Sequence, residues 1–308
     1  MKNITQNNFV KKTHKVKTTI LLKEIFNKRF QFSSHQSNLI KFKLKKSSDS
    51  QNKTDLAFSE KWKKYKKKLN KSETYTNLEF QRKWFLKLYG FNRKNLAKKV
   101  SKSSIILDAG CGLGEKSAWL ASMNPNSIVL GVDLSETPEI AASKYNKTHK
   151  NLFFFKGDIS NLPIKKNKID FIICDQVIMH TSDPSKTFKH LSQLLTPSNG
   201  ELCCYWYAKK ALPRELLDDY FREHVKTLTF DQLWELSKGL TLLGKNLSKI
   251  KVKIDVPKIE ALGIKKQRID LQRFVYWNFI KCFWNEDLGK KTSDLINFDW
   301  YSPVNAKR

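Results

Sequence analysis

The sequence predicts an α/β fold: a doubly wound, mostly parallel sheet with helices on both faces, plus a helical insertion or cap. Three observations predict this class. Short apolar runs alternate with amphipathic stretches from about residue 104 to residue 207. A glycine turn, Gly-Cys-Gly-Leu-Gly at 110–114, directly follows the first run. Pro138 and Pro184 stand near the first turns of two amphipathic stretches, where a missing N–H is tolerated. Strands that alternate with helices are typical of βαβ units and therefore of a parallel sheet.

The individual elements follow from these runs in chain order. Continuous apolar runs are typical of strands buried on both faces, and we expect strands at 104–109, 127–133, 152–157, 169–175 and 201–207. Helices are expected at about 114–123, 137–148 and 184–196, with a shorter link at 160–168. Together these elements make residues 101–208 the α/β core.

The segment before the core divides into two regions. Residues 1–52 are polar and show no sustained periodicity of apolar residues. They are also basic, since residues 1–50 hold 12 Lys or Arg but only two acids. We therefore expect this segment to be mostly disordered and to contribute little to folding stability. Residues 53–100 are expected to supply N-terminal helices, at 58–69 and 77–91, that cover the sheet or act as a lid.

The segment after the core, residues 209–308, is expected to be mainly helical and to cover the substrate. Within it, residues 270–286 are nearly all aromatic or aliphatic between their charges, which predicts a deeply packed helix. An alternating stretch at 247–257 is the alternative source of an additional strand.

Composition narrows the class of protein. Hydrophobic residues make up 40% of the chain, which is enough for a core, yet no run approaches the ~20 apolar residues of a membrane span. We expect a soluble, cytoplasmic protein. The net charge of +29 suggests nucleic acid, but the bases are 50 Lys and only 8 Arg, whereas phosphate recognition favours the Arg fork. The five cysteines form no C-x-x-C pair, which favours buried thiols and no metal site.

Acidic residues stand at the carboxyl ends of four expected strands, and a histidine follows the last. They are Asp108, Asp133, Asp158, Asp175 and, beyond them, His180. Clustered acids are costly unless hydrogen-bond donors satisfy them. A ligand that carries a cation, a diol and an amine supplies such donors, whereas the alternative for the glycines is a tight strand–helix turn without any ligand.

Several motifs occur in order along the core: LDAGCGLGE, GVDLS, GDISNLP, DQVIMHTSDP and LLTPSNGELCCYWY. Over about residues 100–208 the chain thereby resembles the class I S-adenosylmethionine-dependent methyltransferases. Ser198-Asn199 replaces the family's usual first Gly before the fifth strand. The resemblance implies a Rossmann-like sheet of seven strands, of which the sequence offers five. We therefore expect the C-terminal strand pair to be missing, and residues 298–308 to resemble only the lead-in to it.

The resemblance implies a role for each matching residue. Gly110, Gly112 and Gly114 let the backbone approach the cofactor S-adenosyl-L-methionine, and Asp108 holds its amino group. Asp133 accepts from the ribose diol, with Leu134 against the adenine. Asp158 accepts from the adenine amine, with Ile159 beside the ring; a turn-forming acid is the alternative for Asp158. Asp175 and Gln176 lie nearest the methyl group, and His180 faces the acceptor or is a structural histidine.

Two functions remain from this reading. The favoured one is in-line methyl transfer to a small-molecule or glycan- or lipid-type acceptor. The alternative is an RNA methyltransferase that uses the basic surface. It is disfavoured because the fourth strand is followed by Asp-Gln-Val-Ile and not by the N-P-P-Y or D-P-P-Y of the adenine-N-methylating enzymes. A non-catalytic binding module and an NAD(P) oxidoreductase fit the acids and glycines less well.

Overall fold

The computed structural model describes residues 19–33, 38–42, 56, 59 and 71–301. The chain forms two compact units, which are described separately. The first comprises residues 1–47, 92–178 and 183–205, and the second comprises residues 48–91, 179–182 and 206–308.

The first unit contains a seven-stranded sheet, whose strands lie in the order β1-β2-β5-β4-β3-β6-β7. Its strands are β1 (Phe30–Phe32), β2 (Leu39–Phe42), β3 (Ile105–Ala109), β4 (Ile128–Asp133), β5 (Leu152–Lys156), β6 (Phe171–Cys174) and β7 (Glu201–Cys204). All neighbouring strands are parallel except β1, which is antiparallel to β2. The strand order runs outward from β3 in both directions, so the predicted doubly wound, mostly parallel sheet is confirmed.

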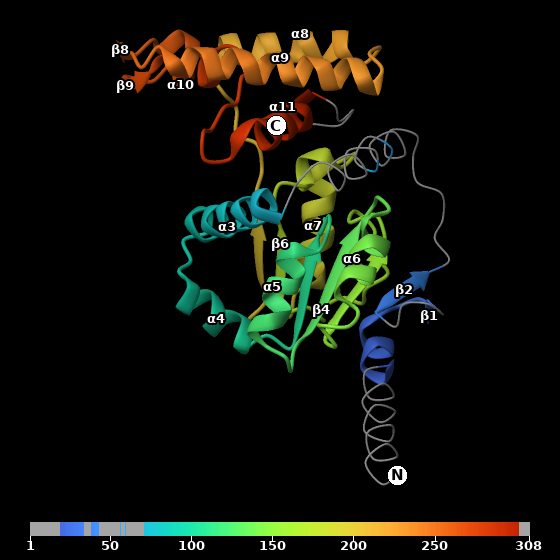
Figure 1. Cartoon of the computed structure of the whole chain (residues 1–308). Coiled ribbons are helices and arrows are strands. Elements are labelled where there is room, and N and C mark those ends of the chain that lie inside the picture. Colours follow the sequence, from blue (N-terminus) through green and yellow to red (C-terminus); the bar gives the residue numbers. More distant parts are fainter. Residues whose placement is uncertain (1–18, 34–37, 43–55, 57–58, 60–70, 302–308) are drawn as a thin grey trace. The chain divides into compact units, whose positions relative to one another are not determined.

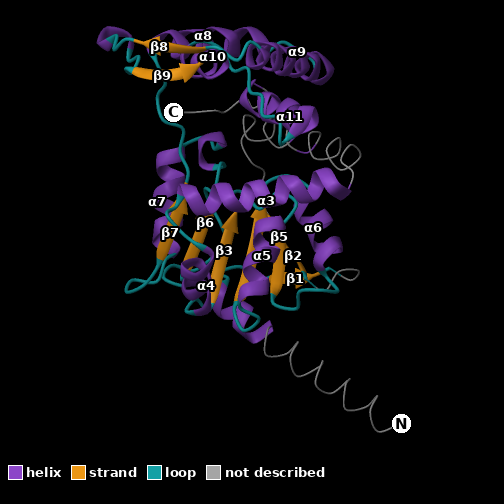
Figure 2. Cartoon of the chain, turned by 60° about the vertical axis from the view of Figure 1, so that its left-hand side comes forward, coloured by secondary structure: helices purple, strands orange, loops and turns teal. Residues whose placement is uncertain are grey.

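Helices lie on both faces of this sheet (Figure 1). They are α4 (Arg93–Ser101), α5 (Glu115–Met123), α6 (Thr137–Tyr145) and α7 (Pro184–Leu194). A short 3-10 helix, Ile178–His180, follows β6 along the chain. Leu191 and Leu194 of α7 pack into the apolar cluster that contains Leu107 and Leu130. On the opposite face Ser117 of α5 bonds to Asp108 of β3. Figure 2 shows the same layering after a turn of the molecule.

The local signals read from the sequence account for the ends of these elements. Pro184 stands at the first helical position of α7, and the Asp183 side chain accepts a hydrogen bond from Lys186 N at 3.0 Å. This is a helix N-cap, which satisfies a backbone donor that the helix leaves without a partner. The strands begin and end within about three residues of the predicted bounds, β7 ending at Cys204 rather than at residue 207.

The expectation that residues 1–52 are disordered is wrong for the part that the structure describes. Residues 19–25 are helical, and β1 and β2 extend the sheet beyond β5. Leu22 and Ile25 are buried, and the Phe26 ring lies 5.6 Å from that of Phe155 in β5. These elements are only a few residues long and lie among lysines, so they give no periodicity over a longer window. Their stability comes from packing against the core.

The second unit is mainly helical and also contains a β-hairpin. Its elements are α3 (Lys71–Leu88), α8 (Leu212–Val225), α9 (Phe230–Lys249), β8 (Lys253–Val256), a 3-10 turn (Glu260–Leu262), β9 (Gln267–Asp270), α10 (Leu271–Asn278) and α11 (Gly289–Tyr301). Thr229 and Gln232 form a capping box at the start of α9. Most of the helix predicted at 58–69 lies outside the described residues, and α3 begins earlier than the helix predicted at 77–91.

The stretch 247–257 does not extend the main sheet. Its strand β8 pairs antiparallel with β9 to form a separate two-stranded sheet. Within the described residues, β7 pairs with β6 alone. The sixth and seventh strands are instead β1 and β2, at the opposite edge.

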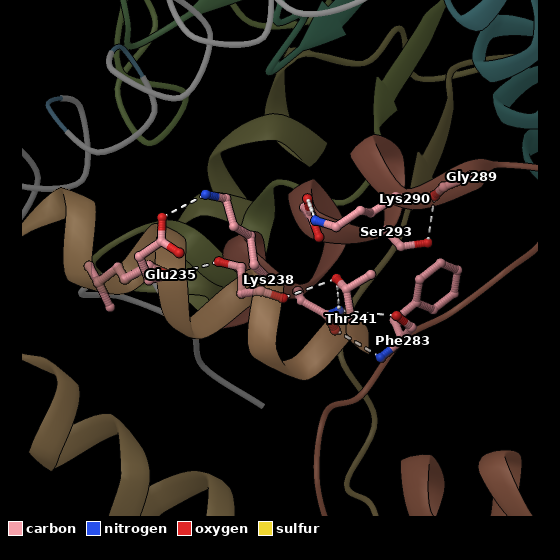
Figure 3. A network of polar contacts seen from close by, with 11 residues as sticks. Glu235, Lys238, Thr241, Phe283, Gly289, Lys290 and Ser293 are labelled. Atoms are coloured by element: carbon pink, nitrogen blue, oxygen red, sulfur yellow. Dashed lines mark hydrogen bonds and ion pairs between the residues drawn. The ribbon is translucent and has the colours of Figure 1, made fainter. Parts of the chain in front are cut away.

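The helix predicted over 270–286 is wrong beyond Asn278, where α10 ends. Two side-chain amides hold the following segment in a non-helical course. Gln272 Nε2 donates to Cys282 O at 2.8 Å, and Asn297 both accepts from Phe283 N at 2.8 Å and donates to Phe283 O at 3.0 Å. Asn297 also donates to Thr241 Oγ1 of α9, and Figure 3 shows Thr241 and Phe283 close together in this network. Tertiary hydrogen bonds therefore override the apolar helical pattern.

No helix in the described ranges combines the length and the apolar character that crossing a membrane requires.

Candidate active site

The four predicted acids all stand at the carboxyl edge of the parallel sheet. Asp108 is the penultimate residue of β3, and Asp133 is the last residue of β4. Asp158 follows β5 by two residues, and Asp175 directly follows β6. Because β3 lies between β4 and β6, the chain reverses its winding direction here, and this is where open α/β sheets bind ligands.

The glycine turn after β3 is tied to β4 by its backbone. Gly110 N and Cys111 N both donate to Val132 O, at 2.8 and 2.9 Å. Gly110, Gly112 and Gly114 have φ values of 87°, 51° and 77°, which L side chains rarely adopt. The turn therefore requires glycine for its conformation, independently of any ligand.

Two of the three glycines also make room for other parts of the chain. A Cβ at Gly110 would overlap the Val177 side chain. At Gly114, it would come within 2.8 Å of the Phe154 ring and 2.9 Å of Ala141. The predicted approach of a ligand to these glycines is thus not the whole reason for them, and packing within the protein explains a substantial part.

The Asp133 carboxylate is held in one orientation by the glycine turn and by Ser135. Gly112 N donates to its Oδ2 at 2.9 Å, while Ser135 donates to Oδ1 through its backbone N–H at 3.0 Å and through its hydroxyl at 2.6 Å. A carboxylate oxygen has two lone-pair directions, so Oδ1 is fully used while Oδ2 keeps one direction, and Asp133 can still accept a hydrogen bond from one hydroxyl of a diol. Leu134, which follows it, is half-buried. Sequence reasoning missed Ser135, although an Asp side chain commonly accepts a hydrogen bond from the backbone N–H two residues on.

Asp158 makes the contact that its alternative role predicts. Its Oδ1 accepts a hydrogen bond from Ser160 N at 2.9 Å, which forms a local turn. Its Oδ2 accepts no hydrogen bond from the described part of the chain, so an amine donor can be added without breaking the turn. Ile159 beside it is buried. His190 Nε2 accepts from Leu162 N at 2.9 Å and fixes the end of the same loop.

A buried ion pair that sequence reasoning missed joins α5 to the tip of β6. Lys116 Nζ lies 2.5 Å from Asp175 Oδ2. Burial alone would lower the pKa of Lys116, but the carboxylates of Asp175 and Asp108 outweigh it and raise the pKa. Asp175 therefore already has a cationic partner within the protein. The two partners are 59 residues apart in sequence, and only the placement of Lys116 two residues after the glycine turn hints at the contact.

Asp108 is the most deeply buried acid of the edge, with 1% of its surface exposed. Ser117 Oγ donates to its Oδ2 at 2.6 Å. Burial raises the pKa of Asp108, and Lys116 and the Ser117 hydroxyl oppose this rise. After β3, α5 begins at Glu115, and its N-cap residue Gly114 has no side chain to cap it, so the N–H groups of the first turn remain available to an anion.

Gln176 and His180 follow Asp175 but differ in their surroundings. Gln176 has an exposed side chain and a φ of 62°, which for a residue other than Gly costs roughly 1–2 kcal/mol. His180 is buried and belongs to the second unit, where its ring lies 5.9 Å from that of Tyr207, edge to face. No cluster of three metal-ligating side chains occurs among the described residues.

The donors and acceptors at this edge fit S-adenosylmethionine. Asp133 and Asp158 retain acceptor capacity for hydroxyl and amine donors, and Asp108 places a further carboxyl group at the same edge. The uncapped start of α5 offers donors for a carboxylate.

Comparison with known proteins agrees with this geometry. A family model described as a methyltransferase domain matches residues 100–272. An uncharacterised methyltransferase of Schizosaccharomyces pombe is 32% identical over 117 residues, which cover 35% of this chain and 42% of that protein. A tRNA U34 carboxymethyltransferase of Campylobacter fetus is 35% identical over 102 residues, which cover 33% of this chain and 36% of the relative. The chain thus spans less than half the length of these relatives.

Among solved structures, a SAM-dependent methyltransferase from Aquifex aeolicus is 28% identical, with a TM-score of 0.31. The match covers 34% of this chain and 57% of that one, and a score this low adds no argument of its own. The family model covers more than half of the chain. The chain therefore belongs to the methyltransferase domain family and contains a class I S-adenosylmethionine-dependent methyltransferase domain, whose cofactor is S-adenosylmethionine.

Proposed function

We propose that this methyltransferase acts in line on a small-molecule or glycan- or lipid-type acceptor. The observation that carries methyl transfer in this proposal is the fixed orientation of Asp133, which Gly112 and Ser135 hold from two sides while one lone pair of Oδ2 stays available for a ribose hydroxyl. An acid that is already oriented loses little entropy when it binds its ligand.

The chain's own residues take these roles in the proposal. Asp133 binds the ribose, with Leu134 beside the adenine. Asp158 accepts from the adenine amine, with Ile159 against the ring. Asp108 and the turn Gly110–Gly114 hold the methionine part, and Asp175, oriented by Lys116, lies with Gln176 nearest the reacting carbon.

Catalysis by such a site depends mostly on positioning. The bound cofactor supplies a methyl carbon that its sulfonium already activates. Correct alignment of two reactants can provide about 7–11 kcal/mol of the barrier reduction. We propose that His180 accepts the proton of an acceptor hydroxyl, since a base near neutral pKa adds a factor of about 10²–10⁴. Its ring contact with Tyr207, which in turn lies 4.7 Å from Trp300, gives it the aromatic surroundings that suit a small or lipid-type acceptor.

Calorimetric titration with S-adenosylmethionine tests the assignment of Asp133. Asp133→Ala removes one charge-assisted hydrogen bond to the ribose, worth about 1.5–3 kcal/mol, so affinity should fall by about tenfold or more. Glu136→Ala is the matched control, because Glu136 is an exposed acid three residues away. Normal binding by Asp133→Ala, with its circular dichroism unchanged, would show that the ribose is held elsewhere.

The acceptor class is tested by transfer of a radioactive methyl group into cell extract separated into small-molecule, lipid and RNA fractions. We expect label in the first two fractions and its loss in His180→Ala. The alternative, an RNA acceptor, draws support from the +29 charge and from the tRNA-modifying relative. Label that appears in the RNA fraction and disappears after ribonuclease treatment would favour that alternative.

The cysteines support a cytoplasmic site of action. All five are free thiols, and four of them are buried. Free thiols persist in reducing compartments, whereas oxidising compartments favour disulfides.

A further inference from the structure

The second unit contains a cluster of cations around one tyrosine hydroxyl. Lys281 Nζ lies 3.2 Å from Tyr276 Oη, and it also sits over the Tyr276 ring at 5.2 Å and the Trp300 ring at 4.8 Å. The Arg214 guanidinium lies over the same two rings at 5.6 and 5.3 Å. Lys210, 4.8 Å from the Trp277 ring, adds a third cation.

The charges of this cluster are unequally compensated. Arg214 is fully buried with Asp218, whose carboxylate it meets at 2.8 Å, so this pair is internally neutral. Lys281 is only 7% exposed, yet no carboxylate in the described part of the chain forms an ion pair with it. Glu215 lies beside Lys210 and accepts its backbone N–H.

Such a buried ammonium is expensive. The cost of removing an ion from water exceeds what the face of an aromatic ring returns. The positive charge of Lys281 also shifts the pKa values of neighbouring groups. Burial lowers the pKa of Lys210, and Arg214 and Lys281 lower it further. Burial alone would raise the pKa of Tyr276, but Lys281, followed by Arg214 and Lys210, outweighs burial and lowers it.

The segment that carries Lys281 is held firmly in place. The buried amides of Gln272 and Asn297 bind the backbone of Cys282 and Phe283. The Cys282 carbonyl packs directly on Gly244 of α9, where a Cβ would overlap it. Two buried amides and a glycine of α9 therefore fix the position of the segment that carries the uncompensated cation.

We infer that Lys281, with Lys210 and the Tyr276 hydroxyl, binds an anionic oxygen group of the methyl acceptor, a phosphate or a carboxylate. The inference rests on the proposed function, because it assigns the substrate class to the unit that contains His180. A series of ring contacts joins the two: His180 to Tyr207, Tyr207 to Trp300, and Trp300 to Lys281. An anion bound there would pair with the ammonium group of Lys281, which no carboxylate of the described residues does.

The test compares Lys281→Met with Lys245→Met in the full chain. Met keeps the length and apolar stem of Lys but removes the charge. Lys245 is the matched control, because it also lies over a tryptophan, Trp284, at 5.1 Å, but outside the cluster. Inorganic phosphate and acetate are titrated by calorimetry, and S-adenosylmethionine is titrated into the same samples.

We expect phosphate or acetate to bind the unmodified chain and Lys245→Met alike, and to bind Lys281→Met at least tenfold more weakly. Phosphate alone binding identifies a phosphate site, and acetate alone a carboxylate site. Without anion, Lys281→Met should melt at the same or a higher temperature, because an unpaired buried charge is gone. A merely structural Lys281 predicts a lower melting temperature.

Equal anion binding by both variants, or none by the unmodified chain, would overturn the inference while leaving cofactor binding intact. Failure of S-adenosylmethionine to bind any sample would instead contradict the proposed function. If Lys281→Met does not fold, Lys210→Met provides the second measurement, since Lys210 lies outside the clamped segment and the same loss of anion binding is expected.

Discussion

Replacing Leu22 by Ala should destabilise the first unit by about 3 kcal/mol, whereas the same change at Leu21 should cost less than about 1 kcal/mol. Leu22 is 0% exposed and packs in the core cluster with Ile25, Phe26 and Ile164. Leu21 is 44% exposed on the same helix. A buried Leu→Ala change removes apolar contacts and leaves a cavity, which typically costs about 2–5 kcal/mol. We take the lower part of this range because a short helix can shift to close part of the cavity.

The assay is urea or thermal unfolding of both variants, followed by circular dichroism. For a unit of this size, 1 kcal/mol corresponds to about 2–4 °C, so Leu22→Ala should lower the melting temperature by about 6–12 °C. Leu21→Ala serves as the control for the change in helix propensity and composition. Equal, small effects of the two changes would refute the packing of this helix on the sheet and restore the sequence-based expectation that the N-terminal segment is dispensable.

Three further predictions use the same kind of pairing. Lys116→Met should lower the free energy of unfolding by about 3 kcal/mol, because it leaves the buried carboxylate of Asp175 without its cation. Since the pKa of Lys116 is raised, this contribution is present at neutral pH and is lost as pH rises above about 10.5, which unfolding at a series of pH values would show. Gly110→Ala should cost more than about 2 kcal/mol, and Val177→Ala should recover part of that loss in a double-mutant cycle; strict additivity would contradict the overlap. Gly244→Ala should destabilise α9, whereas Gly239→Ala, with open space around it, should stabilise it by about 0.5–1 kcal/mol; similar effects would show that Gly244 is not in close contact.

The sheet and its acidic edge could be predicted because their signals are local. A strand buried on both faces needs a continuous apolar run, as at Ile105–Ala109, and an acid that ends such a run lies at the sheet edge. The same rule places Asp133 and Asp175 at this edge. The helix start at Pro184 was equally local.

The rest depended on contacts between distant residues. The strands β1 and β2 are too short for a periodic signal, and aromatic packing against Phe155 stabilises them. The pair Lys116–Asp175 and the amide clamp on Phe283 each join residues of different elements. No pattern within one segment reveals which lysine, among 50, meets a carboxylate and which remains uncompensated.

The glycine turn shows how a motif can combine two requirements. Gly112 N donates to Asp133, and Gly110 N and Cys111 N donate to Val132 directly before it. The turn and the tip of β4 are therefore one hydrogen-bonded unit, and the acid assigned to the ribose also stabilises the turn assigned to the methionine part. A change at Asp133 consequently alters the conformation of the turn as well as the ribose contact. Loss of cofactor affinity in Asp133→Ala must be compared with Ser135→Ala, which weakens the hold on the carboxylate but keeps its acceptor oxygens. A much smaller loss in Ser135→Ala is expected if the carboxylate itself contacts the ribose, because orientation alone is then only part of the effect.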